Sequence, residues 1–144
     1  MQKKRTVFVD QVVGSERLNI VSPIGSAFPL HCLASGKAML STLSDAELIK
    51  VIGRKPLEQH TATTVLDVEE LQAQLAEIRE THVAFDNEEH LEGVSAIGTP
   101  IQEPGGKMYA ISIPVPTVRF THHKDALVKA FLETRAKILE EIAM

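Results

Sequence analysis

The amino-acid sequence predicts a single α+β domain, in which helices pack on an antiparallel sheet. The chain has 144 residues, about the size of one ordinary domain, so one hydrophobic core is expected. Hydrophobic residues make up 44% of it and charged residues 24%, a composition typical of a folded globular protein. The predicted elements follow one another as hairpin, helices, hairpin and helix, an order typical of an antiparallel sheet that carries helices.

A first hairpin is predicted near the N-terminus. Residues Thr6 to Val13 are rich in β-branched side chains, Gly14-Ser15 follows them, and Arg17 to Val21 alternate as a paired strand would. The first strand begins only a few residues after Met1, so its sheet would lack a neighbour that an earlier segment normally supplies. We therefore expect the chain to be a fragment of a longer protein, with a truncated N-terminal strand.

Short helices are predicted in the next part of the chain. One begins near Ser35, whose hydroxyl is a suitable N-cap. Ser44 and Glu47 have the spacing of a capping box, which predicts a second helix over Asp45 to Ile52. Gly53 is placed to end that helix.

A longer helix follows a polar stretch at residues 54–66. Asp67 is its predicted N-cap, with Glu70 as the capping partner. Apolar residues then recur at helical spacing and form a stripe that would face the core. These residues are Val68, Leu71, Leu75 and Ile78.

The remaining sequence changes to a two-residue period and then ends in a helix. Strands are predicted over Val83 to Asp86, Val94 to Ile101 and Lys107 to Val115. The motif Pro104-Gly105-Gly106 predicts a tight hairpin turn between the last two. A long amphipathic helix is predicted over Asp125 to Ala143.

Charge and composition exclude several classes of function. The chain has 15 basic and 19 acidic residues and a formal net charge of -4, the wrong sign for binding to nucleic-acid phosphates. Aromatic residues are only 4% of the chain, so base-stacking platforms are not expected. No apolar run approaches the ~20 residues that span a bilayer, and no signal-peptide core follows Met1. We expect a cytoplasmic protein with no membrane partner.

The chemistry-bearing motifs do not predict a catalytic centre. Ser35-Gly36-Lys37 is not a phosphate loop, because His31 and Ala38 stand where that motif needs Gly and Ser or Thr. The start of the helix there could hold a carboxylate, or it could be a plain capped helix. Cys32 is the single cysteine, which excludes an internal disulfide, and we expect it to be a buried, inert thiol.

Two histidine motifs are not expected to bind metal. His31-Cys32 and Glu88-Glu89-His90 contain metal-ligating residue types, but adjacent residues of a strand point to opposite faces, and no tight ligand spacing is present. His122-His123, at a predicted helix start, is interpreted as a solvated pair. We expect neither a metal nor a cofactor.

Two polar residues within apolar strands are more informative. Asp86 follows the apolar stretch Val83 to Phe85, and it either ends the strand in water or faces a cavity where its charge needs a donor. Ser112 lies within the run Ala110 to Ile113 and would need a partner if it faces inward.

Together these motifs resemble the effector-binding domain of IclR-family transcriptional regulators, in the family's order and approximate spacing. The resemblance extends from Val7 onward and rests on Pro29-Leu30-His31, Ser35 to Leu40, Phe85 to His90, Gly93 and Ala110 to Ile113. It implies a GAF-like or profilin-like α+β fold, with a curved antiparallel sheet flanked by helices. It also implies a small-molecule pocket in the concave part of the sheet.

The resemblance implies which residues line this pocket. They comprise apolar walls, amide donors at the helix start and two polar side chains: Ile20, Phe28, Ala34, Ser35, Asp86, Val94, Ala96 and Ser112. Ala96 and Pro114 stand where some relatives have a Cys and a second Ser, so this pocket would offer fewer side-chain donors. Amides at Ser35 favour an anion whereas an ionised Asp86 repels one, so the expected ligand has two ends: a carboxylate and a hydroxyl, hydrated carbonyl or amine.

The resemblance implies a regulatory, non-enzymatic function. The expected effector is a small organic acid, a hydroxy-, keto- or amino-carboxylate, and its binding would alter the oligomeric state and DNA binding of the full-length regulator. We expect a homodimer or tetramer that contacts operator DNA only through a winged helix-turn-helix domain, which these 144 residues lack. Two alternatives stay open: a standalone GAF-like enzyme such as a sulfoxide reductase, disfavoured because only Cys32 is present, and a natural single-domain partner of a full-length regulator.

Overall fold

A three-stranded antiparallel sheet is the centre of the computed structural model, which describes residues 6–7, 25 and 27–143. Its strands are β3 (Ala84–Asn87), β4 (Val94–Gln102) and β5 (Met108–Pro116), in the order β3-β4-β5. The predicted turn joins the last two, with Gly106 at φ 95° and its amide donating to the Glu103 carbonyl at 2.9 Å. The three predicted strands and their hairpin are thus confirmed.

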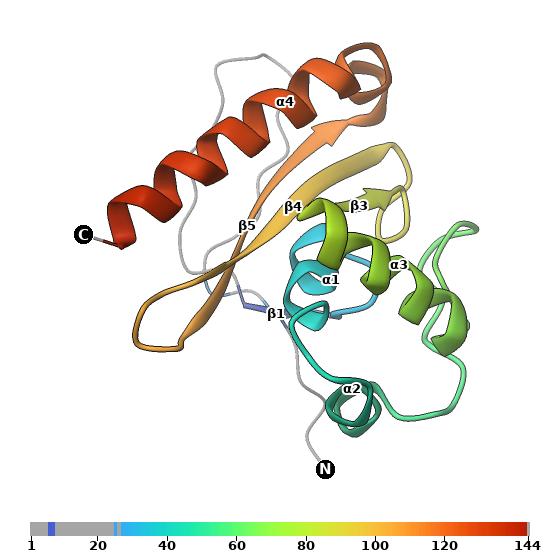
Figure 1. Cartoon of the computed structure of the whole chain (residues 1–144). Coiled ribbons are helices and arrows are strands. Elements are labelled where there is room, and N and C mark those ends of the chain that lie inside the picture. Colours follow the sequence, from blue (N-terminus) through green and yellow to red (C-terminus); the bar gives the residue numbers. More distant parts are fainter. Residues whose placement is uncertain (1–5, 8–24, 26, 144) are drawn as a thin grey trace.

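Helices cover both faces of this sheet. Figure 1 shows α4 (Thr117–Ile142) on one side and α1 (Ala34–Leu40) with α2 (Asp45–Ile52) on the other. The third helix, α3 (Val68–Thr81), packs against α1. Among the described residues, no helix is long and apolar enough to span a membrane.

The two faces hold separate hydrophobic clusters because neighbouring residues of β4 point in opposite directions. Ala96 faces α1 and joins the cluster formed by Ala38, Leu48, Leu71 and Leu75. The next residue, Ile97, is fully buried on the opposite face. It packs there with the two aromatic rings of α4, Phe120 and Phe131.

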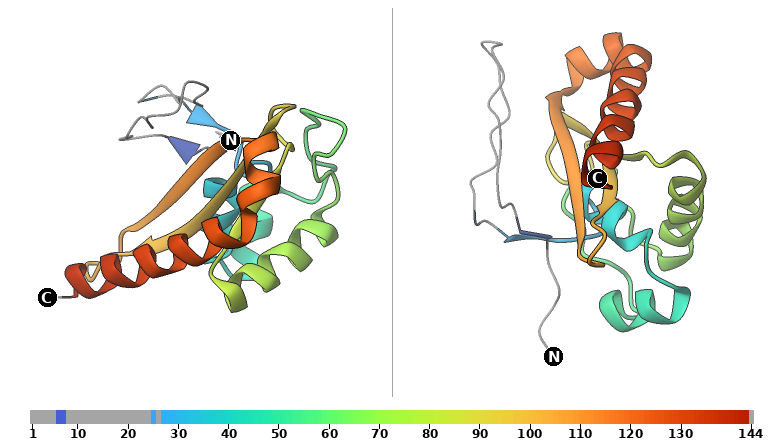
Figure 2. Two further views of the ribbon diagram at one scale, coloured as in Figure 1. Left: turned by 90° about the horizontal axis from the view of Figure 1, so that it is seen from above. Right: turned by 60° about the vertical axis from the view of Figure 1, so that its left-hand side comes forward.

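A second, two-stranded ladder pairs β1 (Thr6–Val7) with β2 (Ala27–Phe28) in antiparallel register. Both views of Figure 2 show it on the β5 side of the larger sheet. Most of the predicted first hairpin, including its second strand at Arg17 to Val21, lies outside the described residues.

The predicted N-cap of the first helix is wrong. Leu33 is the N-cap of α1 and makes no capping side-chain bond, while Ser35 lies two residues further in and is buried. Close packing explains the small residues at this point. A Cβ atom on Gly36 would collide with the backbone of Leu30, and one on Gly98 would lie 2.9 Å from the Ala34 carbonyl carbon.

The next two helices, α2 and α3, begin where the sequence predicts. Ser44 and Glu47 form a reciprocal capping box, with backbone-to-side-chain distances of 3.2 and 3.1 Å. Asp67 caps α3 by accepting from the amide of Glu69 at 2.9 Å, not through Glu70 as expected.

The last helix is longer than predicted. It begins at Thr117 instead of Asp125, and a non-helical residue, His123 (φ -123°), separates the additional turns from the predicted segment. Phe120 is buried among the sheet residues, so tertiary packing favours these extra turns although their sequence has no helical stripe. His122-His123, expected at a helix start, lies at this kink.

Candidate functional site

Most of the predicted pocket residues lie on the face of the sheet that packs against α1, as the pairing of the strands shows. Asp86 pairs with Ala96, and Ser112 pairs with Gly98, which lies against Ala34. Directly paired residues share a face, as do alternate residues along a strand, so Val94 faces the same side. The structure therefore brings these side chains to the N-terminal end of α1.

The remaining predicted residues lie as follows. Ser35 is buried in the first turn of α1. Phe28, in β2, contacts the ring of His90 edge-on at a centroid distance of 5.3 Å. Ile20 lies outside the described residues.

Asp86 faces the interior, which excludes the first of the two alternatives left open by the sequence, a carboxylate that ends the strand in water. It is only 2% exposed, and its Oδ1 accepts a hydrogen bond from the amide of Glu89 at 2.8 Å. Burial raises the pKa of Asp86 to about 7, and the negative charge of Glu89 adds to the increase. Asp86 can therefore exchange a proton near neutral pH.

A buried ion pair that the sequence did not reveal lies beside Asp86. Lys37, from α1, is 1% exposed, and its Nζ donates to both carboxylate oxygens of Glu89 at 2.6 and 2.7 Å. The same Nζ donates to the Phe85 carbonyl at 3.0 Å, which uses all three of its protons. This ion pair links α1 to the segment that follows β3.

Three threonine hydroxyls also bind that segment. Thr61 and Thr63 both donate to the Glu88 carbonyl, at 2.6 and 2.8 Å, and Thr64 donates to the Glu89 carbonyl at 2.5 Å. The sequence showed these residues only as a polar stretch. Threonine is common in exposed loops, so composition alone gave no signal of this contact.

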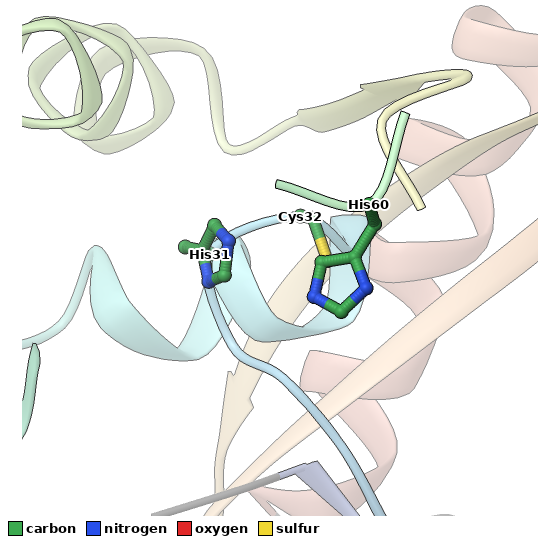
Figure 3. Close-up of side chains that lie close together, drawn as sticks. All are labelled: His31, Cys32 and His60. Carbon is green, nitrogen blue, oxygen red and sulfur yellow. The ribbon is translucent and has the colours of Figure 1, made fainter. Parts of the chain in front are cut away.

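A cluster of imidazoles borders the site. His31 and His60 have ring centroids 5.8 Å apart, and those of His60 and His90 are 5.5 Å apart. The side chain of Cys32 lies with His31 and His60 (Figure 3). The sequence argument against a site at His31-Cys32 assumed in part that both residues lie in a strand. This assumption is wrong, because they lie in a bend that leads into α1.

A separate hollow among the described residues lies elsewhere. A groove of about 940 Å³ lies between α2, α3 and the segment that joins them, and none of the predicted pocket residues lines it. Its walls carry exposed charges of both signs, including Lys50, Arg54 and Glu69. We place the candidate site at Asp86 because buried, perturbed polar groups converge there.

The fold is that of an α+β domain, with buried polar groups between the sheet and the helix on one of its faces. The chain belongs to the IclR family. Residues 1–140 match the family described as bacterial transcriptional regulator IclR C-terminal. The predicted family and α+β fold are both confirmed.

Individual relatives agree with this assignment. The chain is 37% identical over 134 residues to the HTH-type transcriptional regulator Rv1719 of Mycobacterium tuberculosis, a match that covers 93% of the chain and 51% of the relative. It thus spans about half the length of that protein. The crystal structure of the Thermotoga maritima IclR aligns with a TM-score of 0.83 at 28% identity, over 100% of this chain and 59% of that one.

One solved structure contains a small molecule. The inducer-binding domain of PobR from Acinetobacter, as a double mutant in complex with 3-hydroxybenzoic acid, aligns with a TM-score of 0.80 at 25% identity. The alignment covers 96% of this chain and 83% of that one.

Proposed function

We propose that this chain is the effector-binding domain of an IclR-type transcriptional regulator and binds a small hydroxy-, keto- or amino-carboxylate at Asp86. The observation that carries the proposal is a buried carboxyl group, 2% exposed, on the sheet face against which α1 packs. The complex of the PobR domain with 3-hydroxybenzoic acid, which has a carboxylate and a hydroxyl, supports this ligand class.

Each end of such a ligand has a complementary group. The first amides of α1, at Ala34 and Ser35, have no acceptor within the helix and lie at its positive end, so they favour a carboxylate. A hydroxyl or amine on the ligand can donate to ionised Asp86. Within the described part of the chain, the Ser112 hydroxyl has no hydrogen-bond partner and is free to bridge the two ends.

The two ends must stay apart. Unit charges of the same sign 4 Å apart repel by ~4 kcal/mol at an effective dielectric constant near 20. A carboxylate placed directly against ionised Asp86 would therefore bind poorly, whereas a donor there would favour the ionised form. Because the pKa of Asp86 is about 7 in the free domain, binding of the donor end should release part of a proton at neutral pH.

The apolar boundary of the proposed site limits the size of the ligand. Phe28 and Val94 would wall it, Ile20 and Ala96 would complete it, and a few carbons or one small ring would fit. Ala96 and Pro114 supply no side-chain donor, so the ligand need not match that of relatives with polar residues there.

A series of contacts connects Asp86 to α1, so an effect of ligand binding at Asp86 would reach that helix. The Asp86 carboxylate holds the Glu89 amide, and Glu89 in turn pairs with Lys37 of α1. A ligand that competes for Asp86 therefore changes the contacts of both the β3–β4 connection and α1. In the full-length regulator, we propose that this changes the homodimer or tetramer, and with it operator binding through a winged helix-turn-helix domain outside these residues.

Thermal unfolding in the presence of candidate ligands tests the proposal. A ligand that binds only the native state raises its stability by RT ln(1 + [L]/Kd), about 2.7 kcal/mol at 100 Kd. Hydroxy-, keto- and amino-carboxylates should include a stabilising compound, while the matched alcohols, amines and plain alkyl acids should stabilise less. If only the apolar or uncharged compounds stabilise the domain, the two-ended ligand is wrong.

A regulatory role is favoured over a catalytic one. The relatives are named transcriptional regulators, and Cys32 is the single cysteine available for thiol chemistry. Assay of methionine sulfoxide turnover with a dithiol reductant separates the two, and we expect none above the rate without protein.

A further inference from the structure

A compact group of metal-ligating side chains lies next to the proposed effector site. His31, Cys32 and His60 each present one ligand atom, and these atoms all lie within 4.8 Å of one another. Figure 3 shows the sulfur of Cys32 together with the two imidazole rings. His31 and Cys32 precede α1, whereas His60 comes from the distant segment between α2 and α3, so only the fold brings the three together.

A hydrogen bond of one imidazole fixes which of its two nitrogens has the lone pair that a metal needs. Nε2 of His31 lies 2.8 Å from the Glu58 carbonyl oxygen, which can only accept a hydrogen bond. Nε2 therefore carries the proton, and the lone pair of His31 lies on Nδ1. A backbone carbonyl that fixes the tautomer in this way is the usual second partner of a metal-bound histidine.

The same residue also contacts the second imidazole. The Glu58 carboxylate lies 3.9 Å from Nε2 of His60.

We propose that His31, Cys32 and His60 bind a divalent transition metal ion, and that zinc is the metal which this ligand set fits best. One thiolate and two imidazoles are typical zinc ligands, whereas magnesium and calcium prefer oxygen. Metal–ligand bonds of about 2.0 to 2.3 Å in a tetrahedron place ligand atoms about 3.3 to 3.6 Å apart. The separations, all within 4.8 Å, therefore need to close by up to about 1.5 Å.

Binding requires the loss of one proton. The Cys32 thiol is fully buried, and a thiol must lose its proton before it binds a metal. The metal replaces that proton, which passes to solvent as the S–H bond is exchanged for a sulfur–metal bond. Three protein ligands leave one tetrahedral position for water or another donor. His90, whose ring centroid lies 5.5 Å from that of His60, borders the cluster.

Titration of the reduced, metal-free chain with Co²⁺ tests this proposal without any effector. We expect one equivalent to produce a thiolate-to-cobalt charge-transfer band, and Zn²⁺ to abolish it by displacement. Cys32→Ser should remove the band, and His60→Gln should weaken Co²⁺ affinity by about tenfold or more. His122→Gln, an exposed histidine on α4, is the matched control and should change neither.

Absence of a charge-transfer band at one equivalent overturns the proposal. A band that survives Cys32→Ser, or an affinity that His60→Gln lowers no more than His122→Gln, also overturns it, because the metal would then bind surface histidines. His60 is exposed, so its variant should keep the wild-type circular dichroism spectrum. The His60→Gln variant therefore tests the proposal even if the Cys32→Ser variant does not fold because its substitution lies at a fully buried position. The result is independent of the effector proposed above.

Discussion

Replacement of Lys37 by methionine should destabilise the domain by about 3 to 5 kcal/mol, because it leaves the Glu89 carboxylate buried without its cation. Both side chains are almost inaccessible to solvent, at 1% and 4%. Glu89 would retain the hydrogen bond that its Oε2 accepts from the Asn87 amide at 3.0 Å. One such bond does not replace a salt bridge that engages both of its oxygens.

The magnitude is large relative to the total stability. Domains of this size unfold with free energies of about 5 to 15 kcal/mol, so Lys37→Met removes a considerable fraction. The double variant Lys37→Met/Glu89→Gln should recover most of the loss. With both charges removed, the introduced methionine packs against apolar neighbours, and the side-chain carbonyl introduced at position 89 still accepts from the Asn87 amide. The strongly unfavourable unpaired charge is then gone.

Urea denaturation followed by far-ultraviolet circular dichroism measures these values. The two single variants and the double variant form a cycle whose coupling energy isolates the pair. The expected coupling is favourable by at least about 2 kcal/mol. Single variants that lose less than about 1 kcal/mol, or a double variant equal to the sum of the singles, would refute the account of this ion pair.

Three further predictions concern packing, capping and pH. Gly98→Ala should lower the free energy of unfolding by about 1 to 3 kcal/mol in urea denaturation, because the added Cβ would lie 2.9 Å from the Ala34 carbonyl carbon. Ser44→Ala should cost about 0.5 to 2 kcal/mol in the same assay through loss of the capping box, and a change below that range would show that the cap contributes little. Asp86 has its pKa raised from 3.8 to about 7. Between these pH values the folded state binds more protons than the unfolded state, so stability should fall as pH rises, by at most about 1.4 kcal/mol per pH unit. Asp86→Asn should flatten that slope in thermal unfolding measured across this range, and an unchanged slope would contradict the assignment.

Local patterns predicted local structure well. The capping box at Ser44 and Glu47, the turn at Pro104-Gly105-Gly106 and the apolar stripe of α3 depend on residues a few positions apart. Such features are encoded by the conformational preferences of single segments. The helix from Asp125 was predicted for the same reason.

The features that the sequence did not reveal all depend on long-range packing. At the start of α1, Gly36 lies against Leu30 and Gly98 lies against Ala34, and no side chain caps the helix. Lys37 and Glu89 are far apart in sequence, and nothing local distinguishes them from exposed charges.

The sequence analysis did not predict the histidine cluster for a different reason. His31 and Cys32 were interpreted as strand residues with opposite orientations, and the bend before α1 removes that restriction. The third member, His60, lies in a segment without helical or strand periodicity. Its position could not be predicted from pattern, because tertiary hydrogen bonds from Thr61, Thr63 and Thr64 hold the end of that segment.

Isothermal titration calorimetry on Asp86→Asn is the most direct test of the proposed effector site. The ligand is the most stabilising carboxylate from the thermal screen, and Asp125→Asn, an exposed carboxyl on α4, is the matched control. Loss of a hydrogen bond to a charged group costs about 1.5 to 3 kcal/mol, so Asp86→Asn should weaken binding about ten- to hundredfold and abolish proton release, while Asp125→Asn binds as the wild type does. Equal affinity of the wild type and Asp86→Asn for that ligand would contradict the placement of the effector site at Asp86.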